Sequence, residues 1–105
     1  MKGKKIYIAG KITGFDGYKE KFAEAEKRLV EMGAIPMNPA VLSKGFKQEE
    51  YLKICFVMIN VCDAVYLLNN WTDSPGARAE RAHALRKGKK IYYEPDIRHK
   101  KKIVK

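Results

Sequence analysis

Short β-rich apolar runs alternate along this sequence with segments of helical character, and this alternation limits the fold more than any other feature. The runs are KIYIA (5–9), AIPMNP (34–39), DAVYLL (63–68) and KIYY (90–93), and helices are predicted over about residues 18–32, 48–61 and 75–87. Strands that alternate with helices pair in parallel through right-handed crossovers. The sequence therefore predicts a small doubly wound α/β sandwich with a parallel sheet of four or five strands.

The length of 105 residues leaves room for one domain, predicted over residues 1–95 and followed by a basic tail at 96–105. The formal net charge is +10, and segment 86–105 holds nine basic residues against two acidic ones, which gives +7 of that total. A basic end attracts nucleic acid or a phosphorylated small molecule, and such charge runs are also typical of a solvated tail. The tail lacks interleaved aromatic residues, so nucleic acid is not the expected partner.

The sequence also indicates where the protein resides. No apolar run approaches the ~20 residues that cross a bilayer, and the run in MKGKKIYIAG is too short for a signal peptide. Cys55 and Cys62 stand seven positions apart, which is not the ligand spacing of a zinc site or a redox pair. We therefore expect buried free thiols, no metal and no membrane contact, in a cytoplasmic protein.

The predicted helix over residues 48–61 is apolar nearly all round, unlike the other two. Leu52, Phe56 and Ile59 lie on one side of it and Cys55 and Met58 on another. A helix of this kind has to be covered on two sides. Because the chain is small, the second cover is expected to be another copy of the same chain, which predicts a homodimer.

Two loops that lead directly from a strand to a helix are candidates for ligand binding. They read GKITGFDG after the first strand and NNWTDSPG after the third. In open parallel sheets, ligands bind beyond the carboxyl ends of the strands. Ser74 suits the N-cap of the following helix, Pro75 its first position and Gly76 a close approach of the backbone to a ligand, so this helix start is a predicted anion site. The Thr13 hydroxyl adds a donor from the first loop.

Glu80 lies six residues past that cap, on the helix face it shares with Ala77 and Ala84. This small-residue face is expected to press against the sheet. A carboxylate near a helix N-terminus is expected to stay ionised and could attack an electrophilic carbon. The alternative is a structural glutamate that pairs with Arg78, Arg81 or a tyrosine hydroxyl.

Several segments together carry a resemblance to a known family. They are IYIAGKITG, NP, YLKICFVMINVCDAVYLLNNW and SPGARAERAHALRKGKKIYY, and the most specific element is the run W-x-x-S-x-G-A-x-x-E from Trp71 to Glu80. Over about residues 5–94 the sequence resembles the DUF4406 family, which is allied to nucleoside 2-deoxyribosyltransferases and deoxynucleoside 5′-monophosphate N-glycosidases. The resemblance implies a flavodoxin-like (Rossmann-like) three-layer fold, a homodimer or larger assembly, and cleavage of a nucleoside N-glycosidic bond.

The resemblance also implies roles for individual residues. Glu80 matches the family's nucleophile and Tyr7 the first-strand tyrosine close to it, while Ser74 and Gly76 match the residues that hold a 5′-phosphate. Gly10, Ile12 and Gly14 match the loop that covers sugar and base. With Thr13 and Trp71 added, the predicted substrate-binding residues are Gly10, Ile12, Thr13, Gly14, Trp71, Ser74 and Gly76.

Two positions depart from the family pattern. Lys11 stands where proline is common, and Cys55 stands eight residues before Asp63, where the relatives carry an aspartate that helps to protonate the leaving base. A thiol is a poor general acid, a role typically worth 10²–10⁴ in rate. Either another acid serves, with Asp73 the nearest candidate, or catalysis is slow, or the protein binds a nucleotide without turnover.

The predicted function is therefore N-glycosidic bond cleavage or base exchange on a (deoxy)nucleoside or its 5′-monophosphate. Its predicted catalytic residues are Glu80, Tyr7 and Asp73, and no metal or organic cofactor is expected. The alternative is a weak or inactive nucleotide-binding module that acts as a sensor or sponge. The basic composition favours a phosphorylated substrate over a neutral nucleoside.

Overall fold

The computed structural model describes residues 1–95, and the predicted basic tail at 96–105 lies outside the described residues. Strands and α-helices alternate in the predicted order: β1 (Lys5–Ala9), α1 (Tyr18–Glu31), β2 (Ile35–Met37), α2 (Gln48–Asn60), β3 (Ala64–Leu67), α3 (Pro75–Arg86) and β4 (Lys90–Tyr93). Short 3-10 turns follow β2 and β3, namely η1 (Pro39–Val41) and η2 (Trp71–Asp73). The α/β class predicted from the alternation is confirmed.

All neighbouring strands of the sheet are parallel, in the order β2-β1-β3-β4. The chain moves outward from β1 to β2, then crosses back over β1 to β3 and continues to β4. The connections therefore change direction between β1 and β3. At such a switch point the helices that follow the two central strands lie on opposite faces and leave a crevice at the carboxyl edge.

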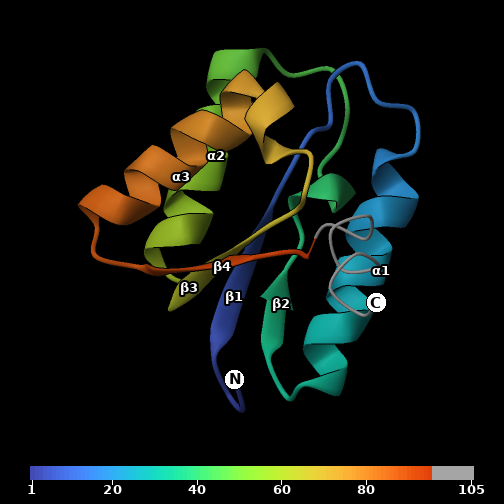
Figure 1. Cartoon of the computed structure of the whole chain (residues 1–105). Helices are drawn as coiled ribbons and strands as arrows, with labels where there is room; N and C mark the ends of the chain where they lie inside the picture. The colour runs from blue at the N-terminus through green and yellow to red at the C-terminus, as the bar shows by residue number, and fades with distance from the viewer. Residues whose placement is uncertain (96–105) are drawn as a thin grey trace.

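The side chains of β1 divide the core into two layers. Ile6 and Ile8 face α1, where they pack with Phe22, Ala25 and Leu29. Tyr7 and Ala9 face the opposite layer, which is built from α2 and α3. Figure 1 shows α1 on one side of the sheet and the pair α2 and α3 on the other, so the molecule is the three-layer sandwich that the resemblance implies.

Helix α2 is covered on one side only within the described part of the chain. Cys55 and Ile59 are buried against the sheet, whereas Ile54, Val57 and Val61 on the outer side are 36%, 61% and 56% exposed. These three positions share one helical stripe because they are three and seven residues apart. The predicted sides, with Phe56 and Ile59 on one and Cys55 and Met58 on the other, both pack into the core, so the exposed stripe is a different one. The homodimer stays a prediction.

Hydrogen bonds tie the two βα loops together at the carboxyl edge. The backbone amide of Lys11 donates to Asn70 Oδ1 at 3.1 Å, and the amide of Leu68 donates to the carbonyl of Ala9 at 2.8 Å. The loops after β1 and β3 are therefore fixed against each other at the switch point. No helix within residues 1–95 is long and apolar enough to cross a membrane.

Glu94, directly after β4, anchors the last strand to the rest of the sandwich. Its Oε1 atom accepts hydrogen bonds from the backbone amide of Asn69 at 2.8 Å and lies 3.1 Å from Lys21 Nζ. Its Oε2 atom lies 2.5 Å from Arg28 Nη2. This one carboxylate joins the end of β4 to α1 and to the loop after β3.

Candidate active site

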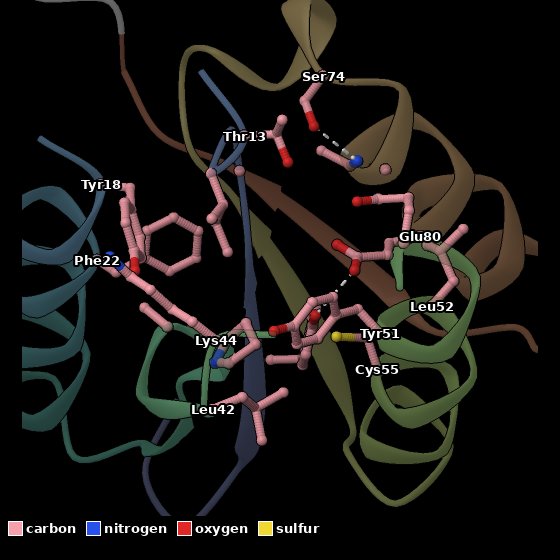
Figure 2. Close-up of a pocket in the computed structure, with 18 residues that line it drawn as sticks. Thr13, Tyr18, Phe22, Leu42, Lys44, Tyr51, Leu52, Cys55, Ser74 and Glu80 are labelled. Atoms are coloured by element: carbon pink, nitrogen blue, oxygen red, sulfur yellow. Dashed lines mark hydrogen bonds between the residues drawn. The ribbon is translucent and has the colours of Figure 1, made fainter. Parts of the chain in front are cut away.

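A cavity of about 290 Å³ opens at the carboxyl edge of the sheet, in the crevice between the loops. Figure 2 shows side chains from β1, α1, α2, α3 and their loops converging on it. Most of the residues predicted for the site line this cavity, namely Tyr7, Gly10, Ile12, Thr13, Ser74, Gly76 and Glu80. The strand order thus gathers residues that are up to 73 positions apart in the sequence.

Ser74 and Glu80 are the only buried polar or charged side chains among residues 1–95, and both face this cavity. Glu80 is held by α3, whose buried face consists of Ala77, Glu80 and Ala84. Small neighbours let the helix lie close to the sheet, so the carboxyl group reaches the floor of the cavity. A buried carboxyl costs free energy unless it is hydrogen-bonded, and here a partner is present.

The partner of Glu80 is Tyr7, whose hydroxyl donates a hydrogen bond of 3.0 Å to Glu80 Oε2. The two arginines considered as partners lie elsewhere: Arg78 donates to the carbonyl of Thr72, and Arg81 donates to the Tyr93 hydroxyl. The carboxyl group therefore has no cation beside it within the described chain. Of the structural partners considered, the tyrosine hydroxyl is therefore the one that contacts Glu80, and it engages the Oε2 atom.

Burial is the main cause of the shifted pKa values of the titratable side chains at the bottom of the cavity. It raises the pKa of Glu80 to about 7, although the hydrogen bonds from Tyr7 and Cys55 pull that pKa downward. Burial and the nearby Glu80 also raise the pKa of the Cys55 thiol to about 12 and the pKa of Tyr7 well above its ordinary value. The expectation that Glu80 stays ionised therefore lacks support, because desolvation disfavours the charged form more than the two hydrogen bonds favour it.

One end of the cavity offers donors to an anion. Ser74 caps α3 by accepting from the amide of Ala77 at 3.1 Å, and Arg78 donates to the carbonyl of Ser74. Because Pro75 has no N–H, the amide of Gly76 is the one in this first turn without a partner in residues 1–95. A Cβ atom on Gly76 would lie only 3.1 Å from Gln48 Nε2. The absence of a side chain at Gly76 thus lets the side-chain amide of Gln48, at the start of α2, reach the Ser74 end of the cavity.

The other walls are aromatic and apolar, with one cation. Tyr18 and Phe22 from α1 form the wall opposite Leu52 and Cys55 of α2 (Figure 2). Lys44, in the loop between η1 and α2, lies at the end away from Ser74 (Figure 2). A flat ring with a polar edge fits between such walls, because apolar lining with few polar groups is typical of small-molecule sites.

Tyr51 fixes the loop that carries Lys44. Its hydroxyl donates to the carbonyl of Ser43 at 2.6 Å and accepts from the amide of Phe46 at 3.2 Å. Its ring also meets Phe46 edge to face, with the ring centroids 5.8 Å apart. The loop is thus held against α2, with Lys44 between its two anchored residues.

Three predicted site residues do not line the cavity. Trp71 packs instead under Arg81, whose guanidinium carbon lies 5.0 Å from the ring centroid. Asp73 is exposed at the end of η2, and Gly14 is exposed in the loop after β1. The position of Asp73 gives no support to its predicted role as the acid that protonates the leaving base.

Eleven lining residues were not predicted as site residues, and they include Tyr18, Phe22, Lys44, Gln48 and Tyr51. Tyr18 and Phe22 follow the 3–4 spacing of a core face, which hid their second role at the end of that face. Lys44 and Gln48 belong to the connection after β2, a strand of only three residues. A third βα loop ends at the same sheet edge, so its polar residues were the available signal.

Solved structures share this fold. A 2-deoxyribosyltransferase from Bacillus psychrosaccharolyticus superposes over 85% of this chain and 70% of that one, with 20% identity and a TM-score of 0.66. A 2-deoxyribosyltransferase from Leishmania mexicana superposes over 86% of this chain and 63% of that one, with 20% identity and a TM-score of 0.68. A CMP N-glycosidase from Clostridium botulinum superposes over 86% of this chain and 70% of that one, with 22% identity and a TM-score of 0.64. At this identity the likeness establishes the fold.

The sequence itself identifies the family. Residues 4–93 match the Domain of unknown function (DUF4406), so the chain belongs to that family. No curated protein matches the sequence. Within residues 1–95, no group of three histidine, cysteine, aspartate or glutamate side chains is placed to hold a metal ion.

Proposed function

We propose that the protein cleaves the N-glycosidic bond of a (deoxy)nucleoside 5′-monophosphate, with Glu80 as the nucleophile. The observation that carries the proposal is the buried Glu80 carboxyl on the floor of the cavity, between an anion-binding end at Ser74 and an aromatic wall. Proteins named as 2-deoxyribosyltransferases and a CMP N-glycosidase share the fold. The names of these neighbours support the substrate class.

The phosphate binds at the start of α3, where the free amide of Gly76, the Ser74 hydroxyl and the helix dipole favour an anion. This contact fixes one end of the substrate, so the sugar lies over Glu80. The ionised carboxylate attacks the anomeric carbon while the bond to the base breaks through an oxocarbenium-like transition state. Water or a second base then resolves the glycosyl ester and frees Glu80, as in retaining glycosidases.

Tyr7 positions and tunes the nucleophile. Its hydroxyl holds Oε2 at 3.0 Å, which fixes the carboxyl group, and its hydrogen bond favours the ionised form of Glu80. Only the ionised fraction attacks. Because the pKa of Glu80 is about 7, base release is expected to rise as the pH rises through neutrality.

The second candidate function is nucleotide binding without turnover, and Cys55 is the observation that favours it. A thiol with a pKa of about 12 does not protonate a departing base at neutral pH. A binder would use the same anion end and the same aromatic wall, so the two functions differ only in base release.

Base release separates the two functions. The full chain is incubated with deoxynucleoside monophosphates and free base is measured by chromatography, with calorimetry for binding. Glu80→Gln is expected to lower release by several orders of magnitude and to keep nucleotide affinity, while the exposed control Glu24→Gln leaves both unchanged. Binding without any release by the wild type would establish the second function.

The proposed assembly is a homodimer through α2. The exposed stripe of Ile54, Val57 and Val61 supports it, because contiguous apolar surface of this kind marks association sites. The proposed location is the cytoplasm, and the free thiols of Cys55 and Cys62 support a reducing compartment.

A further inference from the structure

The cavity holds few groups that could give a proton to a departing base. Its titratable lining residues are Tyr7, Tyr18, Lys44, Tyr51, Cys55 and Glu80. Glu80 is therefore the only carboxyl among the lining residues, and the proposed mechanism uses it as the nucleophile. The other acids are thiol or phenol groups, which are much weaker than a carboxylic acid.

Two of the three tyrosine hydroxyls already donate hydrogen bonds to other groups of the protein. Tyr7 donates to Glu80, and Tyr51 donates to the carbonyl of Ser43. Tyr18 packs beside the α1 core layer. A mechanism that depends on protonation of the base by a strong side-chain acid thus has no group to perform it among the lining residues.

Lys44 is the one cationic side chain that lines the cavity. Both salt bridges found within residues 1–95 use Glu94, so Lys44 has no carboxylate partner in this part of the chain. Ser74 and Lys44 lie at different ends of the cavity, with the Glu80 carboxyl between them (Figure 2). A substrate whose phosphate lies at Ser74 and whose sugar lies over Glu80 therefore extends its base toward Lys44.

We infer that Lys44 stabilises the base as it departs as an anion, and that the preferred substrates are monophosphates of bases that carry a carbonyl oxygen where cytosine and adenine carry an exocyclic amine. The inference rests on the proposed function. When the glycosidic C–N bond breaks, its electron pair passes to the base nitrogen and is delocalised onto the carbonyl oxygens. The Lys44 ammonium donates a hydrogen bond to this charge, and water protonates the base after release.

The choice between bases follows from the hydrogen-bonding capacity of lysine. An ammonium group has three donors and no acceptor, so it pairs with the carbonyl oxygen of uracil or hypoxanthine. The exocyclic amine that cytosine or adenine carries at the same place offers donors and no acceptor. These amino bases would face the cation unpaired, which costs binding of the transition state.

The matched pair dUMP and dCMP tests the inference, because the two bases differ in one carbonyl against one amine. The wild type is expected to cleave dUMP with kcat/KM about 10- to 100-fold above that for dCMP, as for one hydrogen bond to a charged group. Lys44→Met should remove this preference and Lys44→Arg should keep most of it. Lys53→Met, an exposed lysine change on α2 outside the cavity, serves as the control and should change neither rate.

Three results would overturn the inference, and they differ from one another. Faster release from dCMP than from dUMP by the wild type would reject the base preference and leave the proposed function standing. An equal loss for both substrates in Lys44→Met would place Lys44 at the phosphate. No release from either substrate would reject the proposed function, and the inference would fall with it.

Discussion

The Tyr7 hydroxyl lies 3.0 Å from Glu80 Oε2, and this hydrogen bond joins the first strand to the last helix of the described chain. Both partners are buried, Tyr7 fully and Glu80 with 8% of its surface exposed. Burial raises the pKa of Glu80 to about 7, and the hydrogen bond from Tyr7 opposes that rise. Activity and stability should therefore both depend on pH near neutrality.

The Tyr7→Phe change should move the pH profile of base release. The hydrogen bond from Tyr7 lowers the pKa of Glu80, so its loss raises that pKa further and shifts the ascending limb to higher pH. The stability should fall by about 1 kcal/mol, the usual net value of one hydrogen bond. Steady-state rates from pH 5 to 9 test this, and an unchanged midpoint would show that Tyr7 does not tune the nucleophile.

The Glu80→Gln change should stabilise the protein at high pH. In the unfolded chain a glutamate titrates near about 4.3, whereas burial raises the folded pKa to about 7. Between these values the unfolded state releases its proton and the folded state keeps it, so stability is lost as the pH rises. The glutamine variant has no such loss, and its advantage at pH 8 should be on the order of 3 kcal/mol relative to pH 4.

Urea unfolding of both proteins at pH 4 and pH 8 measures this difference. The other titratable groups are common to the two proteins, so their contributions cancel in the comparison. An equal difference in unfolding free energy at both pH values would mean that Glu80 has an ordinary pKa in the folded state.

The Cys55→Asp change should place a second carboxyl beside Glu80 and supply the acid that the cavity lacks. Two carboxyls in one buried site cannot both ionise easily, so one pKa rises and the aspartate is available as an acid near neutrality. Release from dCMP should increase relative to dUMP, because an amino base benefits more from protonation. Cys55→Ser is the control of similar size and should leave the ratio unchanged.

Folding sets a limit on this variant. Burying a further carboxyl could cost several kcal/mol, so the melting temperature is measured first, at pH 5 and at pH 8. The destabilisation should be smaller at pH 5, where both carboxyls are protonated. A variant that is folded at both values and keeps the wild-type ratio of rates would exclude a role for an acid at this position.

The Gly10→Ala change should destabilise the sheet edge through Leu68. A Cβ atom on Gly10 would lie 2.6 Å from Leu68 Cδ1 and 2.9 Å from Leu68 Cβ, and Leu68 is fully buried. Overpacking of this kind typically costs about 1–3 kcal/mol. The double variant with Leu68→Ala should lose less stability than the sum of the single changes, and additive losses would show that the clash is relieved elsewhere.

The exposed stripe on α2 should hold two copies of the chain together. Val57→Asp places a charge at its centre, where the valine is 61% exposed. Sedimentation should then show a dimer for the wild type and a folded monomer for the variant at micromolar concentration. Val30→Asp on α1, where the valine is 55% exposed, is the control and should remain a dimer. A wild-type monomer would contradict the proposal.

The local signals predicted the fold well because they do not depend on distant residues. The start of α3 follows from Ser74 as cap and Pro75 at the first position, and Gly33 follows the end of α1 with a φ of +86°. The alternation of strands and helices was enough for the parallel sandwich. The placement of Tyr7 and Glu80 in one cavity then follows from the strand order.

The sequence patterns did not predict contacts between residues that are far apart in the chain. Glu94 reads as a solvated charge after a short strand, yet it anchors β4 to α1 through Lys21 and Arg28. Trp71 belongs to the most specific motif, but the turn η2 directs it toward Arg81 and away from the cavity. The pKa of Glu80 also depends on burial by the whole sheet, which a helix position alone does not reveal.

The Cys55 thiol at the floor of the cavity has a chemical consequence for the durability of the site. Oxidants and alkylating reagents react with the thiolate, and burial disfavours that form by raising the pKa of the Cys55 thiol to about 12. The sulfur is therefore expected to react slowly with such reagents, although it lies beside the proposed nucleophile. A thiol at this position should thus add little susceptibility to oxidative damage.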